Sequence, residues 1–346
     1  MNTRTIDAIA KAVLYEGYML YPYRASSVKN RQRFNFGVLY PRSYCEAQAG
    51  SDAWSMQTEC LIQGVSPRVE VKLRFLKIVT RTVLDLAGSQ ASQSPSDGSR
   101  ELASSPTPWQ EAIECEVDVP IHDVNALSAS PLPWAFAFSA RAETEPLRDQ
   151  DGRGVGMIAR KQESVCGMVA IKAIPICDKL LKLQVRVDNH TPWETGASQT
   201  GRDAALMRSL VSAHTLLGVV DGEFISLLEP ADDLKDLAAS CQNIGTWPVL
   251  VGAQGERDTM LSSPVILYDY PQIAPESPGD LFDATEIDEI LALRIMTMTE
   301  DEKREMRNTD DRARKILERT ESLPIERLAK LHGTLRDMRA LKQGMP

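Results

Sequence analysis

The run VEVKLRF at residues 69–75 places the strongest constraint on how this chain can fold. Its apolar residues at 69, 71, 73 and 75 alternate with charged residues at 70, 72 and 74. A period of two predicts a β-strand with one face in a core and the other toward water. After Phe75 the apolar set shifts to Leu76 and Ile78, and we expect a β-bulge at this point.

The same pattern recurs in short segments along the first half of the chain. We expect further strands at 34–44, ended by Pro41, and at 113–119, 134–138, 165–174 and 181–188. The stretch RDQDGRGVG at 148–156 is typical of a hairpin loop. Many short strands with little helix between them indicate an antiparallel sandwich or barrel. We therefore predict an α+β fold with an antiparallel β-sandwich-like body and an α-helical C-terminal region.

From about residue 203 the pattern becomes a mixture of helix and strand. We expect helices at 203–214 and 231–243, and strands at 222–230, 247–252 and 264–270. Asp221 and Gly222 predict a turn before the first of these strands. Residues 5–20 at the other end of the chain also show helical spacing, which predicts a short N-terminal helix.

Beyond Gly279 the chain turns helical. Asp283 with Glu286 and Thr299 with Glu302 have the spacing of a capping box. Apolar stripes at helical spacing follow at 287, 290, 291, 295 and 298, at 313, 316, 317 and 320, and at 325, 328, 329, 332 and 335. We expect three or four helices that pack on the β body or on a partner.

The segment AGSQASQSPSDGSRELASSPTP at 87–108 is rich in Ser, Gly and Pro. Such a composition buries too little apolar surface to offset the entropy of ordering. Because the strand pattern resumes after it, we predict a disordered surface insertion and not a domain boundary. The expected organisation is a β-rich body at 1–279, mixed α/β from about 203, followed by a helical region at 280–346.

The net charge of −9 argues against non-specific binding to nucleic acid, which needs a positive field. No stretch approaches the roughly 18 uncharged apolar residues of a membrane span. Lys11 and Glu16 interrupt the apolar run that a signal peptide would need. We therefore expect a cytoplasmic protein without a membrane span.

The cysteines and histidines lack the spacing of metal ligands. The cysteines at 45, 60, 115, 166, 177 and 241 form no CxxC pair, and His122, His190, His214 and His332 do not pair with one another. We expect free thiols that act as small buried hydrophobes, no bound metal and no cofactor. The sequence contains no catalytic fingerprint, so the catalytic residues are unknown.

The opening stretch LYEGYMLYPYR at 14–24 is unusually rich in tyrosine, and a basic run without an acidic residue follows it. Aromatic and arginine side chains are enriched in the centres of protein interfaces. The candidate partner-binding residues are Tyr18, Tyr21, Tyr23, Arg24, Lys29, Arg31 and Arg33. Two other interpretations stay open: an aromatic edge that seals the sandwich beside a solvated basic loop, or a pocket for an anion or substrate.

A second segment, YDYPQIAPESPGD at 268–280, contains two tyrosines and three prolines. Prolines fix an extended path that does not pair as a strand within a sheet. The segment is either a strap that ties the helical end to the β body or a docking strip for a partner.

Several stretches together resemble one protein family. They are AVLYEGYMLYPYRASSVKNRQRFNFGVLYPRSY, WSMQTEC (54–60), NIGTWPVLVG (243–252), SSPVILYDYPQIAPESPGDLFDATEIDEILALRIMTMT (262–299) and ARKILERTESLPIERLAKLHG (313–333). They resemble an uncharacterised bacterial family encoded beside oxygen-tolerant, high-affinity nickel–iron hydrogenases. The resemblance implies a role in hydrogenase assembly, maturation or attachment and carries over no functional residue. The chain lacks the CxxC pairs and histidine-rich tracts expected of nickel delivery.

The expected function is that of a non-enzymatic accessory protein that binds a hydrogenase subunit or a co-encoded accessory protein. The alternative is an enzyme of unknown substrate with a carboxylate-based pocket between the β body and the helices, using acids such as Glu16 and Glu59. A binding protein should present a broad Tyr/Arg surface, whereas an enzyme should show a closed site with convergent acids.

Overall fold

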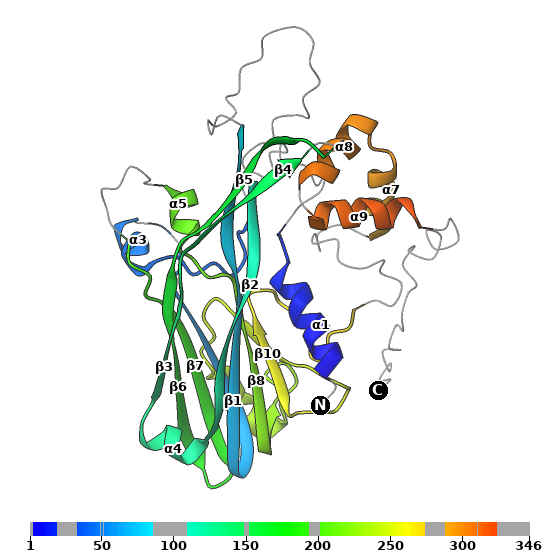
Figure 1. Ribbon diagram of the computed structural model, residues 1–346. Coiled ribbons are helices and arrows are strands. Elements are labelled where there is room, and N and C mark those ends of the chain that lie inside the picture. Colours follow the sequence, from blue (N-terminus) through cyan, green and yellow to red (C-terminus); the bar gives the residue numbers. More distant parts are fainter. Residues whose placement is uncertain are drawn as a thin grey trace.

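The computed structural model describes residues 3–18, 33–48, 50, 52–85, 109–148, 152–193, 201–273, 288–309 and 311–323. Figure 1 shows a tall sheet at the centre and helix α1 (Thr3–Leu14) beside it. A group of C-terminal helices lies next to the upper part of the sheet, above α1.

Strand β1 (Ser55–Asp85) is 31 residues long and organises the sheet. One of its edges pairs first with β7 (Leu180–Asn189) and then with β2 (Trp109–Asp123). The other edge pairs with β8 (Val211–Ile225) and, near the end of β1, with β5 (Gly154–Gln162). All four pairings are antiparallel, so a single strand joins most of the sheet.

The remaining strands extend the sheet on both sides of β1. The order is β3-β6-β7-β1-β8-β10-β9, and β4 adds to β5 as a hairpin. These strands are β3 (Leu132–Phe138), β4 (Arg141–Arg148), β6 (Val165–Cys177), β9 (Trp247–Leu250) and β10 (Thr259–Ser263). The predicted hairpin loop at 148–156 lies between β4 and β5, and its residues 149–151 fall outside the described part of the chain.

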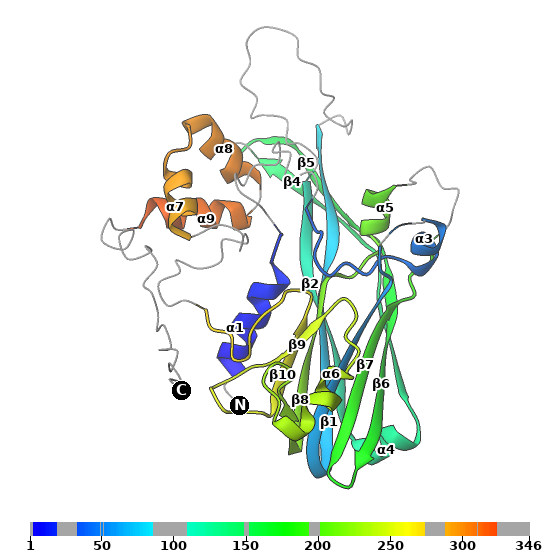
Figure 2. The ribbon, with the colours of Figure 1, turned by 180° about the vertical axis from the view of Figure 1, so that it is seen from behind.

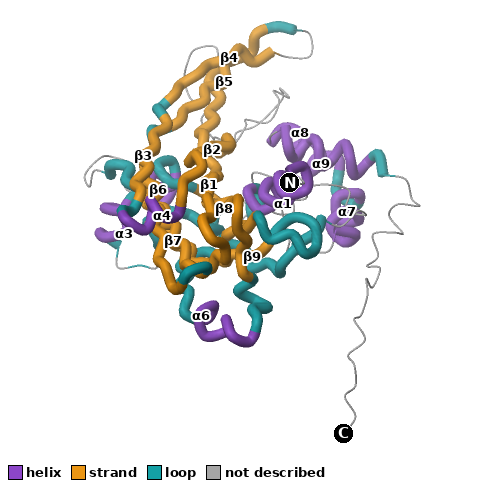
Figure 3. Tube along the Cα trace, turned by 90° about the horizontal axis from the view of Figure 1, so that it is seen from below, coloured by secondary structure: helices purple, strands orange, loops and turns teal. Residues whose placement is uncertain are grey.

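The sheet folds back on itself and encloses the main core. In a flat sheet β1 and β3 would lie three strands, or about 14 Å, apart. Instead, the ring centroids of Phe75 on β1 and Phe138 on β3 are 5.5 Å apart. Figure 3 shows the strands from below, following a curve from β2 through β1 and β7 to β6 and β3. The predicted α+β fold with an antiparallel, sandwich-like body and C-terminal helices is confirmed.

The shift of the apolar positions after Phe75 does not come from a bulge in β1. Phe75 packs in the main core, whereas Leu76 and Ile78 pack in a second cluster with the C-terminal helices. The apolar set shifts because a second face of β1 becomes covered. A register shift does occur between Arg74 and Leu76, but only in the pairing with β8, where the partners move from His214 to Val211. The extra residue therefore lies on β8.

Helix α1 covers part of the sheet face formed by β8 and β10. Its buried residues Ile6, Ile9, Ala10 and Val13 share a hydrophobic cluster with Leu216, Val249, Val251 and Leu261. The predicted helical spacing is confirmed, although the helix ends at Leu14 and not near residue 20. This packing fixes α1 beside the charged face of β1.

Three predicted elements were wrong, the first because burial overrides local propensity. The helix expected at 203–214 is short, α5 (Arg202–Leu206), and β8 begins at Val211 because both of its faces are covered there. Asp221 and Gly222 do not form a connecting turn but lie within β8. The strand expected at 34–44 is instead irregular chain with one bridge at Leu39, followed by helix α3 (Arg42–Ala47).

The other short helices fill the connections between strands. Helix α4 (Val124–Ala129) follows β2, and the backbone N–H of Asn125 in its first turn donates to the Asp123 carboxylate. The helix expected at 231–243 is present as a 3-10 turn (Asp232–Leu234) and α6 (Lys235–Ala239). Figure 2 shows α6 at the lower end of the sheet, on the far side of the view from Figure 1.

The C-terminal helices are α7 (Asp288–Met296), α8 (Glu300–Thr309) and α9 (Asp311–Glu321). The predicted capping box of α8 is confirmed, because the backbone N–H of Thr299 donates to Glu302 and that of Glu302 donates to the Thr299 hydroxyl. The predicted stripe at 313, 316, 317 and 320 is buried. The other predicted cap, at Asp283 and Glu286, and the stripe at 325–335 lie outside the described residues.

Residues 264–270 do not form the predicted strand. The end of this segment instead makes hydrogen bonds to the outer edge of β9. Leu250 donates its N–H to the carboxylate of Asp269 at 2.8 Å, and Tyr270 donates its N–H to the Leu250 carbonyl at 2.7 Å. Tyr268, which directly precedes Asp269, is 86% exposed. The described part of the proline segment, 268–273, is thus a strap on β9, while its remainder lies outside the described residues.

The insertion predicted at 87–108 also lies outside the described residues. The division into a body at 1–279 and a helical region at 280–346 stays a prediction. The second hydrophobic cluster joins the two parts, since it contains Tyr15 and Leu76 together with Leu291, Ile316 and Leu317.

Candidate functional site

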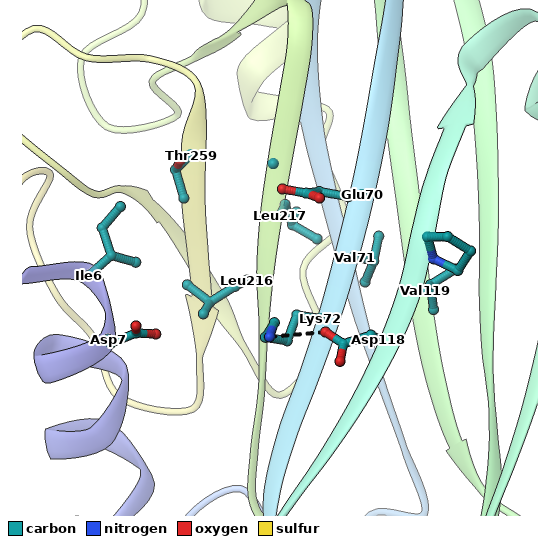
Figure 4. A pocket seen from close by; sticks show the side chains of 12 residues that line it. Ile6, Asp7, Glu70, Val71, Lys72, Asp118, Val119, Leu216, Leu217 and Thr259 are labelled. Atoms are coloured by element: carbon teal, nitrogen blue, oxygen red, sulfur yellow. Dashed lines mark ion pairs between the residues drawn. The ribbon is translucent and has the colours of Figure 1, made fainter. Parts of the chain in front are cut away.

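A groove of about 370 Å³ lies between α1 and the sheet. Its walls come from α1, β1, β2, β8 and β10, through residues Ile6, Asp7, Glu70, Val71, Lys72, Asp118, Val119, Pro120, Leu216, Leu217, Gly218 and Thr259. Figure 4 shows Ile6 and Asp7 on one side and the ion pair between Lys72 and Asp118 on the other. The floor is largely apolar and the rim is charged.

Strand register explains why the charges gather on this face. Glu70, Lys72 and Arg74 alternate along β1, so their side chains project to the same side. Their neighbours on β2 are Asp118, opposite Lys72, and Glu116, opposite Arg74. Lys72 pairs with Glu116 at 2.5 Å and with Asp118 at 2.9 Å. The polar half of VEVKLRF is therefore the charged rim of the groove.

The rim carries more negative than positive charge. Arg74 pairs with Glu116 at 2.8 Å and with Asp7 of α1 at 3.5 Å. With Glu70 and Asp118 there are four carboxylates against the two cations Lys72 and Arg74, which leaves two negative charges. The carboxylate of Glu70 lies over Gly218, where an added Cβ would come within 2.7 Å of it. A side chain at 218 would therefore displace Glu70 from the groove.

A buried histidine lies next to this rim. His214 on β8 pairs with Arg74 of β1 and is 0% exposed. Its Nδ1 lies 2.9 Å from the carbonyl of Ser212, so Nδ1 carries the proton and donates it. Nε2 has no hydrogen-bond partner among the described residues. Burial, with a smaller effect of Arg74, lowers the pKa of His214 to about 4, although the Ser212 carbonyl opposes the shift.

Tyrosine and arginine side chains meet in a second cluster at the end of α1. The guanidinium of Arg312 on α9 lies 3.8 Å from the ring centroid of Tyr15 and also bonds the Tyr15 hydroxyl. That hydroxyl donates to Glu114 of β2 at 2.7 Å, and Arg312 pairs with Glu114 at 3.7 Å. Burial, followed by the bond to Glu114, raises the pKa of Tyr15. The cluster joins α1, β2 and α9.

Tyr18 and Arg33, two of the predicted partner-binding residues, belong to this cluster. Tyr18 is 2% exposed and Arg33 is 4% exposed. The Arg33 guanidinium donates a hydrogen bond to the Tyr18 carbonyl at 3.1 Å and lies over the ring of Phe34. Both side chains are buried in this structure, so neither is exposed while the C-terminal helices cover this cluster. For these two residues the aromatic-edge interpretation is the better one. Tyr21, Tyr23, Arg24, Lys29 and Arg31 lie outside the described residues, and their role stays a prediction.

Tyr15→Phe should lower the free energy of unfolding by about 1–2 kcal/mol, because the Glu114 carboxylate loses a hydrogen bond at a partly buried site. The ring and its contact with Arg312 remain. In urea unfolding, the effect of Tyr15→Phe should shrink in an Arg312→Ala background, since the two groups share one network. Tyr268→Phe, at a largely exposed ring, is the control and should change little. Strict additivity of Tyr15→Phe with Arg312→Ala would contradict the network.

Glu59 and Glu16, the acids named for the alternative enzymatic function, lie in different parts of the fold. Glu59 accepts hydrogen bonds from the backbone of Gln242 at 2.8 Å and from Gln184 at 2.8 Å, and it pairs with Lys182 at 3.2 Å. Burial raises its pKa, but these bonds outweigh burial and the pKa lies below its usual value. Its carboxylate thus joins β1, β7 and the segment after α6. Glu16 follows α1, beside the tyrosine–arginine cluster.

The cysteines and histidines are scattered over the described residues. All six cysteines are free thiols, and only Cys60 and Cys115 are buried as expected. Asp123 beside His122 accepts a hydrogen bond from the backbone N–H of Asn125 and so caps α4. Within the described ranges, no three His, Cys, Asp or Glu side chains lie close enough to hold a metal ion. His332 lies outside those ranges.

Sequence reasoning identified the alternation that forms the groove rim but did not predict the groove. The signal was present in the charged positions of VEVKLRF and of IECEVDV at 113–119. No pattern in the sequence links Asp7 or Thr259 to these strands. Arg312 lies 297 residues from Tyr15, and no local signal connects them.

Comparisons with known proteins leave the family of this chain open. No protein-family profile and no curated protein matches it. Among solved structures, InvG, the secretin of the Salmonella SPI-1 type III secretion injectisome (residues 176 to the end, open gate state), aligns over 64% of this chain and 59% of its own, with 14% identity. The TM-score of 0.14 is too low to indicate a shared fold. Among the described helices, none is both long and apolar enough to cross a membrane.

Proposed function

We propose that this protein is a non-enzymatic accessory protein that binds a component of a hydrogenase system, with a role in assembly, maturation or attachment. The groove between α1 and the sheet carries the binding part of the proposal. An apolar floor inside a charged rim is the arrangement found at protein interfaces. The resemblance of the sequence to the hydrogenase-associated family supplies the context.

The charge of the rim favours a partner segment that carries lysine or arginine. Glu70 is the rim carboxylate best placed to meet such a segment, because its side chain lies open over Gly218 and makes no ion pair with a described residue. The carboxylates of Asp7, Glu116 and Asp118 already pair with Arg74 or Lys72. A partner's cation at Glu70 would gain attraction without breaking an existing pair.

The test is capture of the tagged full-length chain from a host that also carries the hydrogenase genes, followed by mass spectrometry. Glu70→Lys should reduce recovery of the hydrogenase component about tenfold, because two like charges then meet in the groove. Asp232→Lys makes the same charge change at a side chain that is 95% exposed near α6, and it should leave recovery unchanged. Capture without any hydrogenase component would refute the proposed partner, and equal capture by both variants would refute the groove as its site.

A further inference from the structure

The tyrosine–arginine cluster is built like a socket for a guanidinium group. The body supplies the rings of Tyr15 and Tyr18 and the carboxylate of Glu114. Arg312 of α9 fills it, with its guanidinium 3.8 Å and 5.6 Å from the two ring centroids and 3.7 Å from the carboxylate. Stacking on rings together with a carboxylate is the environment that suits arginine better than lysine. We call Tyr15, Tyr18 and Glu114 the arginine socket.

Helix α9 has the pattern of a helix that docks into a groove. Its buried residues Ala313, Ile316, Leu317 and Thr320 follow the spacing i, i+3, i+4 and i+7. Arg312 stands at the start of this stripe, so one helix presents both an apolar face and an arginine. Peptide helices that bind protein grooves use the same combination of spaced apolar anchors and one polar contact.

The contact between α9 and the body combines a shared apolar cluster with polar contacts. On the apolar side, Ala313, Ile316 and Leu317 of α9 share one buried cluster with Tyr15 and Tyr18 of the body. Figures 1 and 2 show the three helices as a separate group above the end of α1. On the polar side, Arg312, Tyr15 and Glu114 form hydrogen bonds and an ion pair where α9 meets the end of α1 and β2. Contacts between parts of one chain that contain such polar groups are typical of reversible interfaces.

We propose that the arginine socket is a docking site for an amphipathic helix of a protein partner that carries an arginine, and that α9 fills the socket in the partner's absence. The inference rests on the proposed accessory function, because it needs a protein partner. Being part of the same chain, α9 competes at a high effective concentration. A partner helix therefore binds with an affinity reduced by the fraction of molecules in which α9 occupies the socket.

The test uses the full-length chain and a fluorescein-labelled, hydrocarbon-stapled peptide with the sequence of Asp311–Glu321, whose binding is followed by anisotropy. In the chain variant Arg312→Ala/Ile316→Asp, α9 loses its guanidinium and a buried anchor. We expect rapid amide exchange in α9, unchanged exchange in the β body and peptide binding at least about tenfold tighter than to the wild-type chain. Arg314→Ala removes an arginine of the same helix that pairs with Asp311, and it should behave as wild type.

A peptide in which alanine replaces its own arginine at position 312 should bind the opened variant at least about tenfold more weakly than the native peptide. The proposal is overturned if the opened variant fails to bind the native peptide or binds both peptides equally. Continued protection of α9 in that variant, or loss of protection throughout the β body, would overturn it as well, because α9 would then be a fixed part of the core. No hydrogenase component enters this assay, so its result is independent of the capture experiment.

Discussion

Replacing Asn189 by alanine should cost about 4 kcal/mol of unfolding free energy, a very large effect for one polar side chain. Asn189 is 0% exposed at the end of β7. Its amide donates to the carbonyls of Leu39 at 2.7 Å and Arg208 at 3.0 Å, and its oxygen accepts from the N–H of Thr191 at 2.9 Å. Alanine would remove all three bonds at a buried position, and the Leu39 carbonyl would keep only the bond from the Leu210 N–H.

Urea unfolding followed by circular dichroism in the far ultraviolet measures this effect. Asn125→Ala on α4 is the matched control, because Asn125 is exposed, and it should change the free energy by less than about 0.5 kcal/mol. Asn189→Asp should also destabilise, since a carboxylate cannot donate to the two carbonyls. A loss below about 1 kcal/mol for Asn189→Ala would mean that the three backbone groups find other partners.

Acid should destabilise the protein through His214 by about 3 kcal/mol between neutral pH and pH 4. The folded-state pKa of about 4 lies below the ordinary value of 6.5, so the unfolded chain takes up a proton first as the pH falls. The contribution of neutral His214 is therefore complete above about pH 6.5, is lost as the pH falls through about 4, and changes no further only below both pKa values. The cause is burial beside Arg74, where an imidazolium would be costly.

Urea unfolding of wild type and His214→Gln at several pH values between 7 and 4 checks this prediction. The variant should be less stable at pH 7 and should lose less stability on acidification. Ser212→Ala keeps the carbonyl that His214 bonds but removes the Ser212 hydroxyl, which donates to Val13 at 3.0 Å. It should be less stable at every pH with the wild-type dependence. Equal pH dependence of His214→Gln and wild type would show that His214 does not carry the effect.

Much of the sheet could be predicted because period-two patterns are local. The alternation at 69–75, 113–119 and 181–188 marks strands that have one covered face. Prediction failed where both faces are covered: residues 211–219 of β8 are continuously buried and show no alternation, and 211–214 of them fall within the helix predicted at 203–214. In the same way, the second cluster over Leu76 and Ile78 produced a pattern that suggested a bulge in β1.

The candidate site was less predictable because its parts come from distant positions. The tyrosines at the N-terminus were correctly seen as unusual, but whether a ring is exposed depends on what covers it. Tyr15 and Tyr18 are covered by a helix almost 300 residues away, and Arg33 reaches back to Tyr18. The amino-acid composition cannot separate an exposed interface from a buried contact within the chain, because both use tyrosine and arginine.

The long strand β1 also dictates when the sheet can be completed during synthesis. β1 ends at Asp85, but its partner β7 ends at Asn189 and β8 at Ile225. Pairings over such sequence distances form slowly, and an edge of β1 remains unpaired until the later strands emerge. Unpaired edges favour association with other chains. We therefore expect the nascent chain to need protection of β1 until residue 225 is available, and we expect no division between residues 55 and 225 to give two parts that fold alone.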